Sequence, residues 1–111
     1  MLVILFRSKL TPEAGEDYNA MSDELHSLVR ENPGFVDVKH FKAEDGERLT
    51  VVWFKDKDSL RAWRQLPRHR EAQMTGRGKW YEYYKMEVAT IERVTEFEKQ
   101  RHAAEALPAV D

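Results

Sequence analysis

The sequence predicts a single α+β domain with the element order β-α-β-β-α-β, in which one antiparallel sheet carries two helices on one face. Two observations predict this fold class. Short segments rich in Val, Ile, Leu and Phe alternate with longer segments whose apolar residues recur every three or four positions. In addition, the pair Asp45-Gly46 separates two of the short apolar segments and is typical of a hairpin turn. This order of elements is that of the ferredoxin-like fold, and 111 residues suffice for one such domain.

Residues 2–8 form the first predicted strand, because they are strongly apolar and too few for an independent helix. A helix is predicted over residues 13–31, with Thr11 as its N-cap and Pro12 in its first turn. Its apolar positions recur at three and four residues: Ala14, Tyr18, Met21, Leu25, Leu28 and Val29. This spacing places them on one face of the helix, which we expect to pack on the sheet.

The segment Asn32-Pro33-Gly34 ends this helix, and two hairpin strands are predicted over residues 35–42 and 49–54. Both strands carry apolar residues at odd and even positions, so both faces of the sheet are apolar there. Two helices cover only one face of a sheet. We therefore expect a homodimer in which the uncovered faces of two sheets pack together.

A second helix is predicted to begin at Asp58 or Ser59 and to restart at Pro67, because proline fits the first turn of a helix and disrupts its interior. The restarted helix should end near Gly76 or Gly78. A long aromatic strand over residues 80–94 follows. It completes the sheet.

The domain is predicted to span residues 1–94. Residues 95–107 have a helical composition with a thin apolar face, so we expect a short helix, a dimer arm or a frayed tail in residues 95–111.

Composition excludes several classes of protein. The chain has no cysteine, which excludes a disulfide framework, a thiolate nucleophile and Cys-ligated metal sites. The formal net charge of −2 favours neither nucleic acid nor an anionic membrane as a partner. The apolar N-terminus lacks a preceding basic region and a cleavage site, so it is interpreted as a strand and not as a signal peptide. We expect a cytoplasmic protein without a membrane span.

Two residues of the segment 54–84 are the main candidates for a small-molecule site. Trp63 is either a flat wall of a cleft or the core anchor of a short helix, and the two roles are compatible. His69 is either a general base or a solvated residue between two arginines. The region is also rich in positive charge that could hold a carboxylate or a phenolate: Arg61, Arg64, Arg68, Arg70, Arg77 and Lys79.

The other polar and aromatic residues are less informative. In a regular strand, Tyr81 and Tyr83 share one face and Tyr84 takes the other, and the sequence does not indicate which face borders the cleft. The remaining histidines are scattered over different elements at no metal-ligand spacing, so no metal site is predicted.

The chain resembles the antibiotic-biosynthesis-monooxygenase (ABM) family of small dimeric α+β-barrel proteins. The resemblance lies in RAW at 61–63, LPRHREAQ at 66–73, GR at 76–77 and WYEYY at 80–84. LFRSKLTPEAGEDY near the N-terminus and NPGF at 32–35 also match, so the resemblance covers about residues 1–94. It implies a ferredoxin-like domain that forms a dimeric barrel. The family includes quinone-forming oxygenases, haem degraders and members of no known activity.

Two branches of the family imply different chemistry. The haem-degrading branch resembles this chain in Trp63, but Phe6 stands where that branch has an Asn and Gln73 where it has the His that binds iron. These differences argue against haem degradation. The quinone-forming branch has an Asn and a Tyr where this chain has Ser59 and His69, which are also hydrogen-bonding residues.

The resemblance therefore implies a cofactor-independent monooxygenase acting on a small aromatic or quinol-type compound, with no cofactor. Trp63 and His69 are the predicted catalytic residues. Residues predicted to contact the substrate are Ser59, Phe6, Gln73 and Tyr83. The alternative is a non-catalytic dimeric protein that binds a small ligand or acts under stress.

Overall fold

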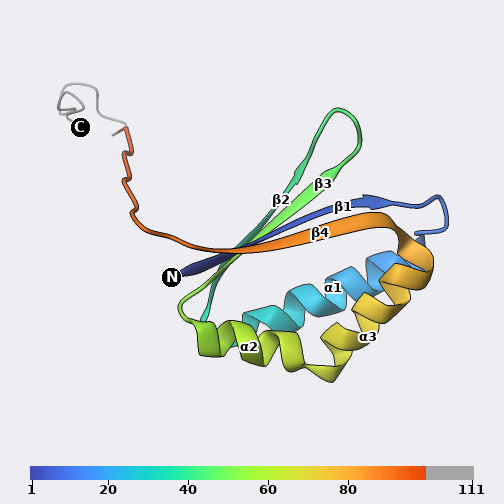
Figure 1. The fold of residues 1–111 in the computed structure, drawn as a ribbon, viewed down its shortest axis with the longest axis horizontal. Coiled ribbons are helices and arrows are strands. Elements are labelled where there is room, and N and C mark those ends of the chain that lie inside the picture. Colours follow the sequence, from blue (N-terminus) through green and yellow to red (C-terminus); the bar gives the residue numbers. More distant parts are fainter. Residues whose placement is uncertain (100–111) are drawn as a thin grey trace.

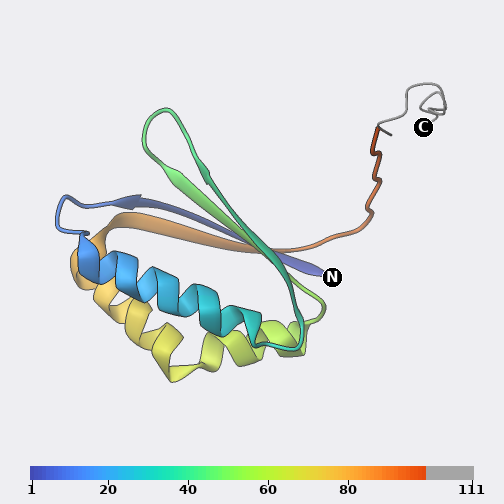
Figure 2. The same cartoon turned by 180° about the vertical axis from the view of Figure 1, so that it is seen from behind.

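The computed structural model describes residues 1–99 and has the predicted ferredoxin-like architecture. Its elements are β1 (Leu2–Leu10), α1 (Glu16–Arg30), β2 (Phe35–Lys42), β3 (Arg48–Phe54), α2 (Lys57–Gln65), α3 (Pro67–Thr75), the π-helical turn η1 (Gly76–Trp80) and β4 (Tyr81–Thr90). The four strands form one sheet in the order β2-β3-β1-β4, and every neighbouring pair is antiparallel. Figures 1 and 2 show all the helices on one face of this sheet.

The helix starts differ from the predicted ones. Thr11 is not an N-cap: its backbone N–H donates to Trp80 O at 2.8 Å and its hydroxyl to Lys79 O at 2.6 Å. The Thr-Pro segment is therefore tied to the end of η1, and α1 begins only at Glu16. At α2, the N-cap is Asp56, whose carboxylate accepts from Ser59 N at 2.8 Å. At α2 a neighbouring polar residue thus takes the capping role, whereas α1 begins after Gly15 without a side-chain cap.

Pro67 stands at the first turn of α3, as predicted. Leu66 before it is extended, with φ −60° and ψ 127°, because the proline ring disfavours a helical conformation in the preceding residue. The chain therefore turns between α2 and α3 instead of continuing as one helix, as Figure 1 shows.

The last strand is shorter than predicted. β4 ends at Thr90, where its pairing partner β1 begins, and Ile91 N still donates to Met1 O at 3.0 Å. Residues 91–99 have no regular secondary structure and lead away from the sheet (Figure 1). Residues 95–99 of the expected helical arm or tail form no helix, and residues 100–111 lie outside the described part of the chain.

The hydrophobic core lies between the sheet and the helices. Its buried members come from β1, α1, β3 and α2: Leu2, Ile4, Val29, Phe54, Leu60 and Trp63. Phe54 is fully buried, at 0% exposure. Burial of each large apolar side chain contributes about 1.5–3 kcal/mol, so this small cluster is the main stabilising feature of the fold.

The opposite face of the sheet has no helix over it, and its centre is apolar while charged residues lie around that centre. Val3 and Leu5 alternate with the helix-facing Ile4 along β1, and β3 pairs Trp53 with Val3. On β2, Phe41 is 49% exposed. Within residues 1–99 no helix is both long and apolar enough to cross a bilayer.

Gly34 and Ser59 form a close contact that joins the start of β2 to α2. A Cβ atom added at Gly34 would overlap both Cβ and Oγ of Ser59. Asn32 reinforces the junction, because its side chain donates to Ser59 O at 2.9 Å and accepts from Gly34 N at 2.8 Å. Glycine is required here by space and not by backbone conformation.

We therefore expect Gly34→Ala to lower the free energy of unfolding by roughly 1–3 kcal/mol, since the buried contact must be forced apart. The matched control is Gly78→Ala, where an added Cβ meets no atom within 4 Å. Urea denaturation of the two variants measures the difference. Equal stabilities for both variants would contradict the contact.

Candidate active site

A cavity of about 170 Å³ lies between the helices and the sheet. All four strands contribute to its wall, through Val38, Val52, Ile4, Phe6 and Met86 among others. Because side chains alternate along a strand, the helix-facing set of each strand points to the same side and makes a mostly apolar surface. The helices α1, α2 and α3 complete the enclosure.

Trp63 and His69 lie side by side in this cavity. Their ring centroids are 4.8 Å apart with an interplanar angle of 47°. The turn at Leu66-Pro67 causes this contact, since it ends α2 just after Trp63 and starts α3 just before His69. Trp63 also belongs to the buried core cluster, so it packs on one side and borders the cavity on the other.

His69 is the polar group whose environment is most unusual. Its Nδ1 atom is buried and has no hydrogen-bond partner among the described residues. Burial lowers the pKa of His69 below its usual 6.5, and the nearby charge of Arg64 lowers it as well, while a backbone hydrogen bond at Arg64 acts in the opposite direction. The imidazole is therefore neutral at pH 7, so one of its ring nitrogens is a hydrogen-bond acceptor.

An aromatic cluster lines the β4 side of the cavity. The Phe6 ring lies 5.7 Å from that of Tyr81 and 5.4 Å from that of Tyr84, and Tyr18 lies 6.1 Å from Tyr81. Burial raises the pKa of Tyr81, so this phenol stays protonated. Such a cluster provides a flat, dry surface for an aromatic ligand.

The predicted alternation of the β4 tyrosines is wrong. Tyr81 and Tyr84 both border the cavity, whereas Tyr83 does not. A bulge explains this, because Tyr83 pairs with Lys9 while Tyr81, two residues earlier, pairs with the adjacent Leu10. The extra residue shifts the side chains by one position.

The structure brings together four of the six predicted site residues. Phe6, Trp63, His69 and Gln73 line the cavity. Ser59 lies outside it, at the Gly34 contact. Tyr83 also lies outside, and its hydroxyl donates to Glu47 Oε2 at 2.6 Å.

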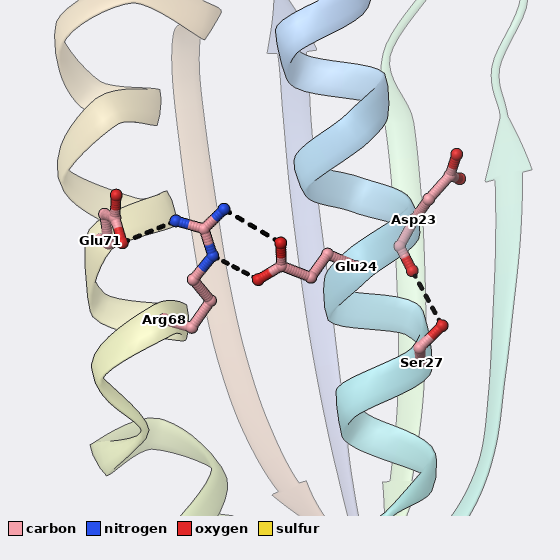
Figure 3. A network of polar contacts seen from close by, with 5 residues as sticks. All are labelled: Asp23, Glu24, Ser27, Arg68 and Glu71. Atoms are coloured by element: carbon pink, nitrogen blue, oxygen red, sulfur yellow. Dashed lines mark hydrogen bonds and ion pairs between the residues drawn. The ribbon is translucent and has the colours of Figure 1, made fainter.

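Arg68 and Lys79 are paired with acidic residues that do not line the cavity. Arg68 binds Glu24 of α1 and Glu71 of its own helix, and thereby links α1 to α3 (Figure 3). Lys79 Nζ bonds Asp17 at 2.7 Å. Arg64, in contrast, is part of the cavity wall, so it is the basic residue available to a bound anion.

Sequence reasoning missed a second polar group in the cavity wall. His26 of α1 and His40 of β2 approach each other with their Nε2 atoms 3.2 Å apart, and His40 Nδ1 lies 2.9 Å from Thr50 Oγ1. All three residues line the cavity. The fourteen-residue separation of the histidines gives no signal, because only the packing of α1 on the sheet brings them together. Within residues 1–99, no group of three or more His, Asp or Glu side chains could hold a metal ion.

Comparison with known proteins gives consistent results. The family model described as "Antibiotic biosynthesis monooxygenase" (ABM) matches residues 1–75. The uncharacterized protein YqjZ of Bacillus subtilis (strain 168) is 30% identical over 92 residues, which cover 83% of this chain and 81% of YqjZ.

Two solved structures are similar in fold. Rv0793 from Mycobacterium tuberculosis superposes with a TM-score of 0.71 at 16% identity, covering 85% of this chain and 98% of that one. SnoaB, a cofactor-independent oxygenase from Streptomyces nogalater, gives a TM-score of 0.69 at 13% identity, covering 84% of this chain and 94% of that one. At these identities the two structures bear on the fold alone.

Asp17 of α1 bonds Trp80, a residue of the cavity wall. Its Oδ2 atom accepts from Lys79 Nζ at 2.7 Å and from Trp80 Nε1 at 3.1 Å. Trp80 is buried and lines the cavity. The hydrogen bond from Lys79, followed by that from Trp80, lowers the pKa of Asp17 to about 2.

Because the pKa of Asp17 in the folded state lies below its ordinary 3.8, the ionised carboxylate stabilises the fold. This stabilisation is present above about pH 4 and is lost as the pH falls toward 2. We expect Asp17→Asn to unfold at lower urea concentration than the parent at pH 6, and the difference to close near pH 2. Asp58→Asn is the control, since the Asp58 side chain is 93% exposed. A constant difference across this pH range would contradict the assignment.

Proposed function

The chain belongs to the antibiotic biosynthesis monooxygenase family, and from this premise we propose that it is a cofactor-independent monooxygenase acting on a small phenolic or quinol-type aromatic compound. The observation that carries the proposal is the neutral imidazole of His69, which lines an apolar cavity beside Trp63. A neutral imidazole is the kind of general base that the deprotonation of a phenol requires. The description of SnoaB as a cofactor-independent oxygenase supports the type of reaction.

The size of the cavity favours a small ligand. An engineered protein cavity of about 150 Å³ binds benzene, and this cavity measures about 170 Å³. A single aromatic ring with small polar substituents fits this space. Trp63 and the Phe6 cluster provide flat surfaces against which such a ring can stack.

The proposed chemistry needs one proton acceptor. His69 takes the proton of the phenol, and the electron-rich phenolate then reacts with O₂ at the ring carbon para to its oxygen. One oxygen atom becomes the second carbonyl of a quinone, and the other leaves as water with the two hydrogens lost by the phenol. The aromatic ring of the substrate supplies the electrons that reduce O₂, so the reaction needs no other reductant.

Arg64 and Gln73 are proposed to assist the proton transfer. A simple phenol has a pKa near 10, and that of His69 lies below 6.5, so transfer costs at least about 5 kcal/mol. The guanidinium of Arg64 in the cavity wall can stabilise the phenolate and reduce this cost. Gln73, one turn after His69 on α3, can orient the ligand oxygen. Phenols more acidic than phenol itself should therefore be the better substrates.

We assign Ser59 and Tyr83 no contact with the ligand, because neither side chain reaches the cavity. Ser59 instead fixes the start of the helix that carries Trp63, through its bonds with Asp56 and Asn32.

We also propose that the protein works as a homodimer. On the sheet face opposite the helices, Phe41 is exposed and Trp53 and Leu5 are partly exposed. Contiguous apolar surface of this kind is rarely left uncovered in a soluble protein. A second copy of the same face is complementary to it by two-fold symmetry.

The catalytic proposal predicts that His69→Gln loses about 10²–10⁴-fold in turnover, the usual contribution of a general base. O₂ uptake with a panel of acidic phenols, hydroquinones and anthrones measures this. Activity of the parent should fall as the pH drops through the pKa of His69, below 6.5, because only the neutral ring accepts a proton.

Tyr83→Phe is the matched control and should retain parental turnover, since its hydroxyl lies outside the cavity. Parental turnover by His69→Gln would remove His69 from the mechanism. Absence of O₂ uptake with every compound, together with tight binding of some of them, would favour the non-catalytic ligand-binding protein.

The dimer proposal predicts a mass near 26 kDa, twice the 13.1 kDa of the chain, at micromolar concentration. Leu5→Glu should shift the mass to that of the monomer, because it places a charge in the centre of the apolar face. Met74→Glu, at a position on α3 that is 70% exposed, should remain dimeric. Sedimentation velocity distinguishes these outcomes, and a monomeric parent would overturn the proposal.

A further inference from the structure

The string Thr50–His40–His26 forms a second hydrogen-bonding site in the cavity wall, and the proposed chemistry of His69 does not use it. Thr50 Oγ1 lies 2.9 Å from His40 Nδ1, and His40 Nε2 lies 3.2 Å from His26 Nε2. Both nitrogens of His40 are thus engaged. Within the described part of the chain, Nδ1 of His26 makes no protein hydrogen bond, so this atom remains for a ligand.

The string can carry its hydrogen bonds in either direction. When His40 Nδ1–H donates to the hydroxyl of Thr50, His40 Nε2 accepts from His26 Nε2–H, and His26 Nδ1 is an acceptor. When the Thr50 hydroxyl donates to His40, both rings adopt the other tautomer, and His26 Nδ1–H is a donor. The two states contain the same number of hydrogen bonds, so neither requires an unpaired group.

Both rings must be neutral for this reversal. Partial burial lowers the pKa of His40, and the charges of His26 and Arg48 lower it further. A neutral imidazole has one donor and one acceptor nitrogen, whereas an imidazolium has two donors and would break the string.

We propose that His26 binds a second oxygen of the aromatic ligand, and that the reversible string lets it accept from a hydroxyl or donate to a carbonyl at the same position. This inference rests on the proposed function, since the second oxygen is the one that the reaction adds para to the phenol oxygen: it is a carbonyl in the quinone product and a hydroxyl in the hydroquinone form of that product. The placement supports it: β2, which carries His40, and β4 are opposite edges of the sheet, and α3, which carries His69, lies on the β4 side of α1 (Figure 3). The two sites therefore approach the cavity from different sides.

The test measures binding of three stable probes without O₂: phenol, hydroquinone and 4-hydroxybenzaldehyde. Phenol lacks the second oxygen, hydroquinone supplies a hydroxyl, and the aldehyde supplies a carbonyl. His26→Phe keeps a ring and removes both nitrogens. This variant should weaken the binding of hydroquinone and of the aldehyde by about 3- to 10-fold, the effect of one hydrogen bond. It should weaken the binding of phenol by less than about 2-fold. Tyr83→Phe, with a hydroxyl outside the cavity, is the control.

Nitrogen-15 NMR of the histidine rings tests the reversal in the unaltered protein. Hydroquinone should favour the tautomer of His40 with the proton on Nδ1, and the aldehyde the tautomer with the proton on Nε2. Equal weakening of all three probes by His26→Phe, or the same His40 tautomer with both para-substituted probes, would overturn the inference. Absence of O₂ uptake with these binding differences intact would instead contradict the oxygenase proposal and leave the hydrogen-bonding site standing.

Discussion

The contact between Trp63 and His69 is the feature on which the rest of the site depends. Trp63 packs with Leu2, Ile4 and Phe54 on its buried side, and His69 lies 4.8 Å from its other side. The same indole therefore belongs to the core and to the wall of the cavity. Because the core is close-packed, the position of the indole is fixed. Contact with the indole in turn fixes the position of His69. A helix without the Leu66-Pro67 break would carry His69 past this position.

Burial then decides what the histidines can do. His69 and His40 are both held neutral near pH 7, chiefly because a charged ring would lose contact with water. A neutral ring can accept or donate a proton within a hydrogen bond, which a solvated imidazolium cannot do in both directions. The exposed cations of the same region behave differently. Arg68, bound to Glu24 and Glu71, joins two helices at the surface, where such pairs contribute little to stability, and it takes no part in the cavity.

Local irregularities determine which aromatic residues surround the ligand. The bulge opposite Lys9 and Leu10 turns Tyr81 and Tyr84 to the cavity, although they are three residues apart. In a regular strand such residues would lie on opposite faces. The resulting cluster with Phe6 makes the β4 side of the cavity flat and apolar, while the β2 side carries the two hydrogen-bonded histidines. The two ends of the cavity thus differ in chemistry.

The sequence by itself determined the order of the elements, the turn at Gly46, the break at Pro67 and the candidate pair Trp63 and His69. These features depend on residues close together in the chain, whose conformational preferences and spacing can be recognised from the sequence alone. Only the tertiary structure decided that Thr11 and Ser59 support junctions, that β4 contains a bulge, and that His26 meets His40. Each of these outcomes depends on contacts between distant segments, and a linear pattern does not contain the packing that brings such segments together.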